Sequence, residues 1–273
     1  NSRDITLRAL DILRDADVLV AEDTRTLRRL LEIHGVSVSG RPLISYNDHN
    51  GAGRRAQLLR HLKAGKSVAL TSDAGTPGIA DPGFALARAA LAEGYKVEGA
   101  PGPTAAISAL IVSGLPTDRF LFAGFLPPKK TARLADLKEL AQTRATLVLY
   151  ESPKRCLETI KDIGSVFGEG GQVAMCRELT KTYEEVKRDS LGELARWAEG
   201  EVRGEITIVV AGASDDERRY ASGLGDDEAI AAAVRKRMES GLSRKEAAAE
   251  VADRAGLSKR YVYDVSLRTV DDT

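Results

Sequence analysis

Apolar and polar positions alternate along this chain with two different periods, which predict helices and strands that follow one another. Residues 1–15 carry apolar side chains at helical spacing, and the run VLVA at 18–21 is typical of a short buried strand. The order then repeats, and this alternation predicts a mostly parallel sheet with helices on both faces. In the first half we expect helices at 24–34, 54–63 and 84–92 and strands at 18–21, 42–46, 67–71 and 96–98.

The pattern changes at residues 115–130, where three prolines surround an apolar and aromatic centre. We interpret this stretch as the crossing into a second domain. Beyond it the pattern predicts helices at 131–142, 154–167 and 191–199 and strands at 146–150, 172–176 and 205–211.

The chain therefore divides into four expected parts. We predict an N-terminal α/β domain at 1–117, a second α/β domain at 118–214, a charged linker at 215–226 and a helical module at 227–273. The expected fold class is α/β, with two domains that hold mostly parallel or mixed sheets and a small C-terminal helical module. Because a βα unit begins with a strand whereas residues 1–15 predict a helix, we expect a further strand ahead of Asn1.

Composition narrows the classes of partner. The 273 residues hold 40 basic and 40 acidic side chains, so no general attraction to a polyanion or a membrane follows, and any nucleic-acid surface has to be local. Apolar runs stay well below the roughly 18 residues of a membrane span. Because Cys156 and Cys176 have no cysteine or histidine neighbours at metal-binding spacing, we expect buried thiols in a reducing, cytoplasmic compartment and no metal site.

Two stretches rich in glycine and proline follow expected strands and precede expected helices. LTSDAGTPGIADPG occupies 70–83 and APGPTAA occupies 100–106. Such loops expose backbone N–H and C=O groups at the carboxyl ends of strands, so we interpret the pair as the floor of a ligand site, although either loop alone is equally typical of a tight turn. GKS at 65–67 lacks the earlier P-loop glycine and comes before a strand, so we reject a nucleoside-triphosphate site there.

Several long motifs carry a family resemblance almost from end to end. They are DITLRAL at 4–10, AEDTR at 21–25, DHN at 48–50, SDAGTPGIADPG at 72–83, PGPTAAISAL at 101–110, GLPTDRFLFAGFLP at 114–127, YESPKR at 150–155, RELTKTYEE at 177–185 and GEITIVV at 204–210. With them the chain resembles the ribosomal RNA small subunit methyltransferase I family of the tetrapyrrole methylase superfamily. It departs in one respect, because that family begins with a strand and a P-x-G-N turn, and this sequence begins at that Asn.

The resemblance implies methyl transfer from S-adenosylmethionine to the ribose 2′-hydroxyl of a cytidine in the decoding centre of 16S rRNA, within the small ribosomal subunit. It also implies two α/β domains with the cofactor between them, and a homodimer. The cofactor-binding positions that match the family are Ser72, Asp73, Ala74, Thr76, Ile79, Ala80, Thr104, Ala105, Tyr150, Glu151, Leu179, Glu205, Ile206 and Thr207. We add Asp81, because a carboxylate accepts hydrogen bonds from ribose hydroxyls or an ammonium group, although an aspartate before Pro82 is also typical of a turn.

The implied reaction needs a positioned ribose hydroxyl and gains from a general base. Our candidates for catalytic residues are Glu22, Asp23, His49 and Lys181, with Glu178 as a further candidate from the same motif as Lys181.

Other readings of these motifs stay open. Residues 22–24 also suit a helix N-terminus with Thr24 as its cap, and residues 177–181 also suit a structural ion-pair cluster. For the RNA, we expect Arg25 to hold a phosphate through its planar guanidinium and Asn50 to contact the substrate.

The C-terminal residues 227–268 are rich in alanine and predict helices, with a tight turn at 256–258 and N-caps at Ser243 and Ser258. Between 235 and 268 the basic residues outnumber the acidic ones by about four, which favours a phosphate-binding face. GLSKRYVY at 256–263 resembles the turn and recognition helix of a helix-turn-helix. We therefore expect Lys245, Lys259 and Arg260 to bind RNA and Tyr261 and Tyr263 to stack on bases, the alternative being tyrosines in the core of a helical hairpin.

Two further functions stay open. A tetrapyrrole C-methyltransferase of the same superfamily should lack the basic tail and carry a shorter glycine–aspartate loop. A ligand-sensing DNA-binding regulator would read DNA with the tail and transfer no methyl group. We favour the RNA methyltransferase because the chain has both the tail and the longer SDAGTP loop.

Overall fold

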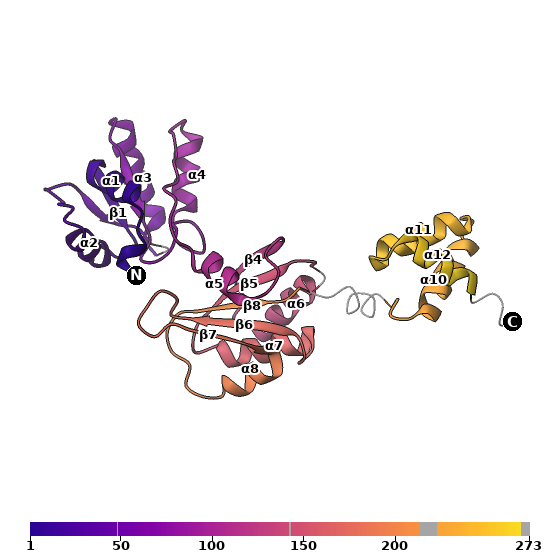
Figure 1. The fold of residues 1–273 in the computed structure, drawn as a ribbon. Helices are drawn as coiled ribbons and strands as arrows, with labels where there is room; N and C mark the ends of the chain where they lie inside the picture. Colours follow the sequence, from indigo (N-terminus) through magenta and orange to yellow (C-terminus); the bar gives the residue numbers. More distant parts are fainter. Residues whose placement is uncertain (48, 142, 213–222, 269–273) are drawn as a thin grey trace.

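The computed structural model describes residues 1–47, 49–141, 143–212 and 223–268 (Figure 1). Its first sheet holds three parallel strands in the order β2-β1-β3. The strands are β1 (Val18–Ala21), β2 (Leu43–Ser45) and β3 (Val68–Thr71). β1 is buried along its whole length because it lies between the other two, with Leu19 opposite both Leu43 and Ala69.

Helices cover both faces of this sheet, as the alternating pattern predicts. Leucines of α1 and α2 pack on one face with Leu19, and Leu58 of α3 and Leu86 of α4 pack on the other with Val18 and Val20. A single 3₁₀ turn, η1, precedes α1. The elements are η1 (Ser2–Asp4), α1 (Leu7–Asp15), α2 (Thr24–Ile33), α3 (Gly51–Lys63) and α4 (Phe84–Ala92).

The strand expected at 96–98 is wrong. These residues are exposed, and Lys96 pairs with Glu98 at 2.6 Å on their own segment. β3 ends the order of the sheet and does not pair with them. A strand is stable only when its backbone groups find a partner, so an apolar residue between two charged ones is too little to define one here.

The second sheet holds five strands in the order β4-β5-β8-β6-β7, parallel between β4 and β5 and antiparallel elsewhere. The sequence pattern missed its two edge strands, β4 and β7. Helices α6, α7 and α8 accompany this sheet in the chain. The bounds are β4 (Phe120–Phe125), β5 (Thr146–Glu151), β6 (Gln172–Arg177), β7 (Glu185–Ser190), β8 (Ile206–Val210), α6 (Lys130–Leu140), α7 (Cys156–Phe167) and α8 (Leu191–Trp197).

Alternate residues of the central strands serve two different cores. Leu147, Leu149 and Ile208 pack with residues of α7 and α8, whereas Val148 and Val209 pack with α5 (Ala105–Ser113). Since α5 packs on the second sheet, the chain joins that core before residue 117, where the sequence analysis places the domain boundary; the boundary stays a prediction. Cys156 and Cys176 are free and buried in these two cores, as expected.

Three helices form a separate small core near the C-terminus (Figure 1). They are α10 (Asp227–Glu239), α11 (Arg244–Ala255) and α12 (Lys259–Arg268). Ser243 begins α11 with a capping box that includes Glu246, and the Ser258 side chain accepts a hydrogen bond from the Tyr261 N–H, which confirms both expected caps. Most of the expected linker and residues 269–273 lie outside the described residues. Among the described helices, none is long and apolar enough to cross a membrane.

Candidate functional site

The two loops rich in glycine and proline lie against each other. The Thr76 hydroxyl donates a hydrogen bond of 3.1 Å to the carbonyl oxygen of Pro103, which ties the loop after β3 to the loop before α5. The first loop turns sharply, with a positive φ at Gly75, Gly78 and Gly83 and also at Ala80. A positive φ at a residue other than glycine is strained and needs support from its surroundings.

Residues near the N-terminus hold the second loop from its other side. The Thr6 hydroxyl donates to the carbonyl oxygen of Pro101 at 3.1 Å, and the Arg8 guanidinium donates to that of Gly99 at 2.8 Å. The sequence analysis gave these residues no role, although both belong to the DITLRAL motif. In the sequence, only the presence of the motif could have pointed to these two residues. Their contacts join segments about ninety positions apart, so no local pattern contains them.

Asp73 and Asp23 connect the ends of β1 and β3. The Asp23 N–H donates to the Asp73 carboxylate at 3.1 Å. Asp23 is itself the N-cap of α2, where it accepts from the Arg25 N–H at 2.8 Å; Thr24 is the first helical residue and not the cap. The Arg25 guanidinium also pairs with Asp23 at 2.5 Å, and these hydrogen bonds lower the pKa of Asp23 to about 2.

Asp81 is partly buried in the first loop and interacts electrostatically with Glu205 and Tyr150. Burial, together with the negative charges of Glu22, Asp73 and Glu205, raises its pKa to about 6, against a hydrogen bond with Ser72 that lowers it. Glu205 precedes β8, so the charges around Asp81 come from both sheets. The structure therefore brings together acidic residues that the sequence placed in separate motifs.

Tyr150 forms part of the facing wall. Its hydroxyl oxygen accepts a hydrogen bond of 3.1 Å from the N–H of Ala106, in the first turn of α5. The rings of Phe122 and Phe125 pack edge-on against it, with centroids 4.9 and 5.7 Å away. Thr104 caps α5, since its side chain accepts from the Ile107 N–H at 3.2 Å, and Ala105 begins that helix.

Glu151 and Ile206 point away from this wall. Glu151 has a fully buried side chain, which pairs with Arg155 at 2.8 Å and accepts from the Thr159 hydroxyl at 2.6 Å, and Ile206 belongs to the core beneath α7 and α8. In both strands the neighbouring residue, Tyr150 or Thr207, has the opposite orientation. Leu179 packs with the core under α5. Of the residues expected from β5 and β8, only Tyr150 and Thr207 have side chains on the α5 side.

The RELTK motif forms an ion-pair cluster. The Lys181 ammonium lies 2.9 Å from Glu178 and 3.0 Å from Glu205, and Glu178 also accepts from the Glu205 N–H at 2.8 Å. Desolvation opposes these contacts, but the hydrogen bonds to both carboxylates raise the pKa of Lys181. A β-carbon at Gly204 would lie 2.5 Å from the Glu178 Cγ, so only glycine allows this close approach. Lys181 is thus a poor proton acceptor.

The DHN motif is described in part, because Asp48 lies outside the described residues. The Asn50 side chain accepts from the Asn47 N–H at 2.9 Å and lies 3.4 Å from the Ser45 hydroxyl, which holds the turn after β2. The Ser45 hydroxyl in turn donates to the carbonyl oxygen of Glu22 at 3.1 Å. His49 is exposed. These contacts place the motif next to the end of β1.

The charge of the region favours a cationic ligand over a phosphate. Glu22, Asp73 and Asp81 surround the loop ends, while the neighbouring cations Arg25 and Lys181 are already paired with carboxylates. Most of the remaining expected residues are exposed or partly exposed and could be contacted by a ligand: Ser72, Ala74, Thr76, Ile79, Ala80, Thr104 and Ala105. A ligand with a positive charge and several hydrogen-bonding groups fits this set.

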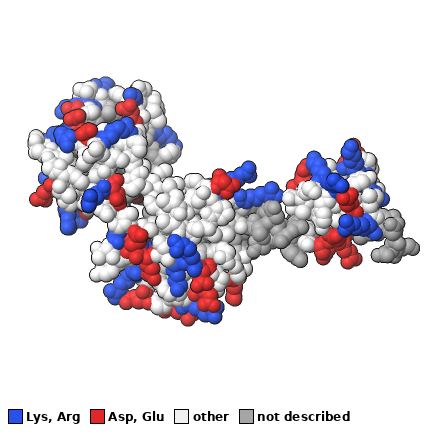
Figure 2. All heavy atoms as spheres, in the orientation of Figure 1, with Lys and Arg blue, Asp and Glu red and all other residues white. Residues whose placement is uncertain are grey.

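The C-terminal helices carry a mixed surface. Basic side chains lie beside acidic ones on the visible face of this unit (Figure 2). Lys259 lies 3.8 Å from Asp253 and Arg260 lies 4.0 Å from Asp264, whereas Lys245 is exposed without an ion pair to any described residue. The Tyr261 hydroxyl donates to Asp227 at 2.5 Å, and both tyrosines are 37% exposed, so neither lies in the core.

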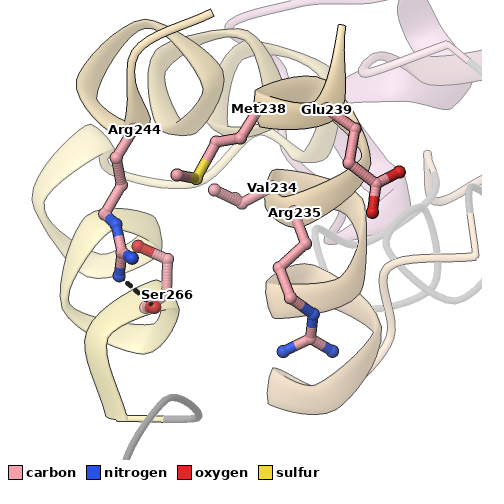
Figure 3. Close-up of a pocket in the computed structure, with 6 residues that line it drawn as sticks. All are labelled: Val234, Arg235, Met238, Glu239, Arg244 and Ser266. Carbon is pink, nitrogen blue, oxygen red and sulfur yellow. Dashed lines mark hydrogen bonds between the residues drawn. The ribbon is translucent and has the colours of Figure 1, made fainter. Parts of the chain in front are cut away.

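A cavity of about 270 Å³ opens between α10 and α12 (Figure 3). Val234 and Met238 form its apolar floor, and the Arg235 and Arg244 side chains flank it. Arg244 donates to the carbonyl oxygen of Ser266 at 2.8 Å and so satisfies a carbonyl of the last turn of α12. The lining of the cavity thus combines apolar side chains with charged ones, among them Glu239.

Sequence comparisons give consistent matches. The profile of the family described as Tetrapyrrole (Corrin/Porphyrin) Methylases matches residues 1–195. A protein of Synechocystis called "Ribosomal RNA small subunit methyltransferase I" is 41% identical over 273 residues, covering 100% of this chain and 95% of its own. A protein of the same name from Escherichia coli O157:H7 is 39% identical over 270 residues, covering 98% of this chain and 91% of its own.

Solved structures share the fold at low sequence identity. A diphthine synthase superposes with a TM-score of 0.60 at 19% identity, over 77% of this chain and 86% of its own. The uroporphyrin-III C-methyl transferase of Thermus thermophilus, complexed with S-adenyl homocysteine, superposes with a TM-score of 0.53 at 22% identity, over 77% of this chain and 91% of its own.

Proposed function

Because the chain belongs to the ribosomal RNA small subunit methyltransferase I family, within the tetrapyrrole methylases, we propose that it methylates the ribose 2′-hydroxyl of a cytidine in the decoding centre of 16S rRNA. It is a methyltransferase that uses S-adenosylmethionine. The proposal is more specific than the family assignment in three respects. It names the substrate nucleotide, the attacked atom and the assembled small subunit as the target.

One observation carries the proposal: the two loops lie together under a ring of carboxylates and face Tyr150 of the second sheet. S-adenosylmethionine supplies an activated methyl group on a positively charged sulfur. Asp73 and Glu22 would attract the cationic parts of the cofactor, and backbone groups of residues 72–80 and 100–105 would bind its adenosine. Tyr150, fixed by Ala106, would close the site from the other domain and help to position the ribose.

We propose that the C-terminal helices bind rRNA through phosphate contacts. Lys245 is exposed and unpaired among the described residues, and Lys259 and Arg260 have only long contacts to aspartates that a phosphate could replace. The exposed rings of Tyr261 and Tyr263 offer stacking surfaces for unpaired bases. The Arg25 guanidinium, which is exposed although paired with Asp23, would reach a phosphate near the loops.

We further propose a homodimer. β4 is an edge strand of the second sheet, and its Phe120, Leu121 and Phe125 are more than a third exposed. Aromatic side chains on an edge strand favour association with a second copy, which would remove that surface from water. Light scattering after gel filtration tests this part, and a monomer at all concentrations would contradict it.

A methyl-transfer assay tests the function. The full chain is incubated with S-adenosylmethionine labelled in its methyl group and, in separate reactions, with small ribosomal subunits, naked 16S rRNA and a uroporphyrinogen. We expect label in RNA, most of it with assembled subunits. Label in the porphyrinoid alone would support a tetrapyrrole methyltransferase, and tight DNA binding without any transfer would support a regulator; either result contradicts our proposal.

A further inference from the structure

The proposed reaction releases the proton of a ribose hydroxyl, and most carboxylates near the loops are unable to accept it. Asp23 is held by the Arg25 guanidinium, and Glu178 and Glu205 share the Lys181 ammonium. The hydrogen bonds from Arg25 lower the pKa of Asp23 to about 2. Those from the Glu205 N–H and Lys181 lower the pKa of Glu178. The Lys181 ammonium also occupies the Glu205 carboxylate, so none of these three suits the role.

Three other candidates, Glu151, Asp73 and His49, are less suited by their positions. Glu151 is buried on the opposite face of β5, where Arg155 and Thr159 occupy its oxygens. Asp73 accepts the Asp23 N–H and supports the end of β1. His49 is exposed on the turn after β2.

Asp81 differs from all of these. It has no lysine or arginine partner in the part of the chain that the structure describes, and it is partly buried. The groups that face it are Glu22 and Asp73 from the ends of β1 and β3, and Glu205 and Tyr150 from the second sheet. The strained residue Ala80 and Pro82 flank it and fix the backbone there. Glu22 also has no lysine or arginine partner among the described residues, but it supplies one of the charges that act on Asp81.

We propose that Asp81 is the catalytic residue that accepts the proton of the attacking 2′-hydroxyl, an inference that rests on the proposed function. The ribose oxygen forms a bond to the methyl carbon while the sulfur–carbon bond breaks and its electron pair goes to sulfur. The hydroxyl proton moves to the Asp81 carboxylate. One positive charge at sulfur and one negative charge at Asp81 thus disappear together, and the net charge of the site does not change.

The surroundings of Asp81 favour this exchange. With a pKa of about 6 the carboxylate is deprotonated at neutral pH and still basic, which is the range that suits a general base. The acidic neighbours destabilise the charged form of Asp81 while the cation of the cofactor stabilises it. Loss of that cation in the reaction therefore increases the tendency of Asp81 to keep the proton.

Two variants of the full-length protein test the role, with Asp136→Asn as a matched control on the exposed surface of α6. At saturating S-adenosylmethionine we expect Asp81→Asn to lower single-turnover methyl transfer to small subunits by about a hundredfold or more. Asp81→Glu, which keeps a carboxylate, should restore transfer to within about tenfold of the native protein. The native rate should rise with pH through about 6 and then level off, and this rise should be absent from Asp81→Asn.

Binding supplies a readout that does not depend on turnover. By calorimetry, Asp81→Asn should bind S-adenosylmethionine within about tenfold of the native affinity, since a proton acceptor is not the main cofactor contact. Two results would overturn the proposal. One is that saturating S-adenosylmethionine restores the methyl-transfer rate of Asp81→Asn, and the other is that this variant has the same rate and pH profile as the native protein. If the native protein itself fails to methylate RNA, the proposed function fails first; if only the variants behave otherwise than expected, this inference alone fails.

Discussion

The two sheets of this protein differ in what their strand ends carry. β3 leads into an exposed loop with a positive φ at Ala80, and the ends of β1 and β3 carry Glu22 and Asp73, which form no ion pair with a described residue. β5 and β8 are buried between two helical layers instead. From this difference we infer that the first sheet would supply the groups that bind ligands and the second sheet would supply a rigid wall. Changes at the loops should therefore alter binding, and changes in the second sheet should alter stability.

The largest effect is expected in the wall. Ile208 is fully buried at the centre of β8, so Ile208→Ala should lower the free energy of unfolding by about 4 kcal/mol through lost burial and a cavity. Urea denaturation followed by circular dichroism measures this loss. A loss below about 1 kcal/mol would mean that the second sheet is not the rigid part of the molecule.

Asp73→Ala should show the opposite behaviour. We expect the Kd for S-adenosylmethionine to rise at least a hundredfold, which is about 2.7 kcal/mol, because a carboxylate that would bind the cation is lost. Stability should change much less than in Ile208→Ala, since Asp73 is exposed. Calorimetric titration checks the affinity, and native binding by the variant would remove Asp73 from the site.

Gly83 lies in the proposed binding loop but acts through the backbone conformation, so its substitution should affect both stability and binding. A β-carbon there would lie 2.9 Å from the Leu70 Cδ2, and φ is 143°. Gly83→Ala should therefore cost about 2 kcal/mol of stability and also weaken cofactor binding. The matched control is Gly53→Ala in α3, where nothing lies within 4 Å of the new atom and a gain of up to about 1 kcal/mol is expected. Equal effects in the two variants would contradict this account.

Asp81→Asn should be less active and more stable. The folded state raises the pKa of Asp81 from 3.8 to about 6, so the folded state holds this proton more tightly than the unfolded state. The native protein thus loses stability as pH rises through this interval, and the loss is complete above about 6. Because Asp81 is partly exposed, we expect the free energy of unfolding of the variant to exceed that of the native protein by only about 1 kcal/mol at neutral pH. Below the pKa of Asp81 in the unfolded state we expect no difference. A thermal unfolding series across pH measures the gain, and a gain independent of pH would contradict its origin.

Much of this arrangement follows from local patterns. Alternating apolar runs predicted the first sheet and its two helical layers, and serine caps predicted the start of α11 and α12. β7 was missed because its residues, EVKRDS, are mostly charged or polar. β4 is apolar throughout, but the prolines around it led us to interpret that stretch as a crossing between domains. Residues 96–98 were overpredicted because strand pairing is decided by tertiary structure.

The site was predictable as a set of motifs but not as a set of roles. Tyr150 and Glu151 are neighbours on β5, and strand geometry alone requires that they face opposite sides. The resemblance assigned both residues to the cleft. In the structure, only the Tyr150 side chain lies on the side of the sheet that packs against α5. The acidic surroundings of Asp81 come from Glu22 and Glu205 on distant segments, which no single motif contains.

Nucleoside analysis of the product tests the central claim most directly. Small subunits that lack the modification are treated with the purified protein and S-adenosylmethionine, and their rRNA is digested to nucleosides for mass spectrometry. Our account predicts one new methyl group on the ribose of a cytidine, and none with Asp73→Ala. A methyl group on a base, or no methylated nucleoside at all while a porphyrinoid accepts the methyl group, would contradict it.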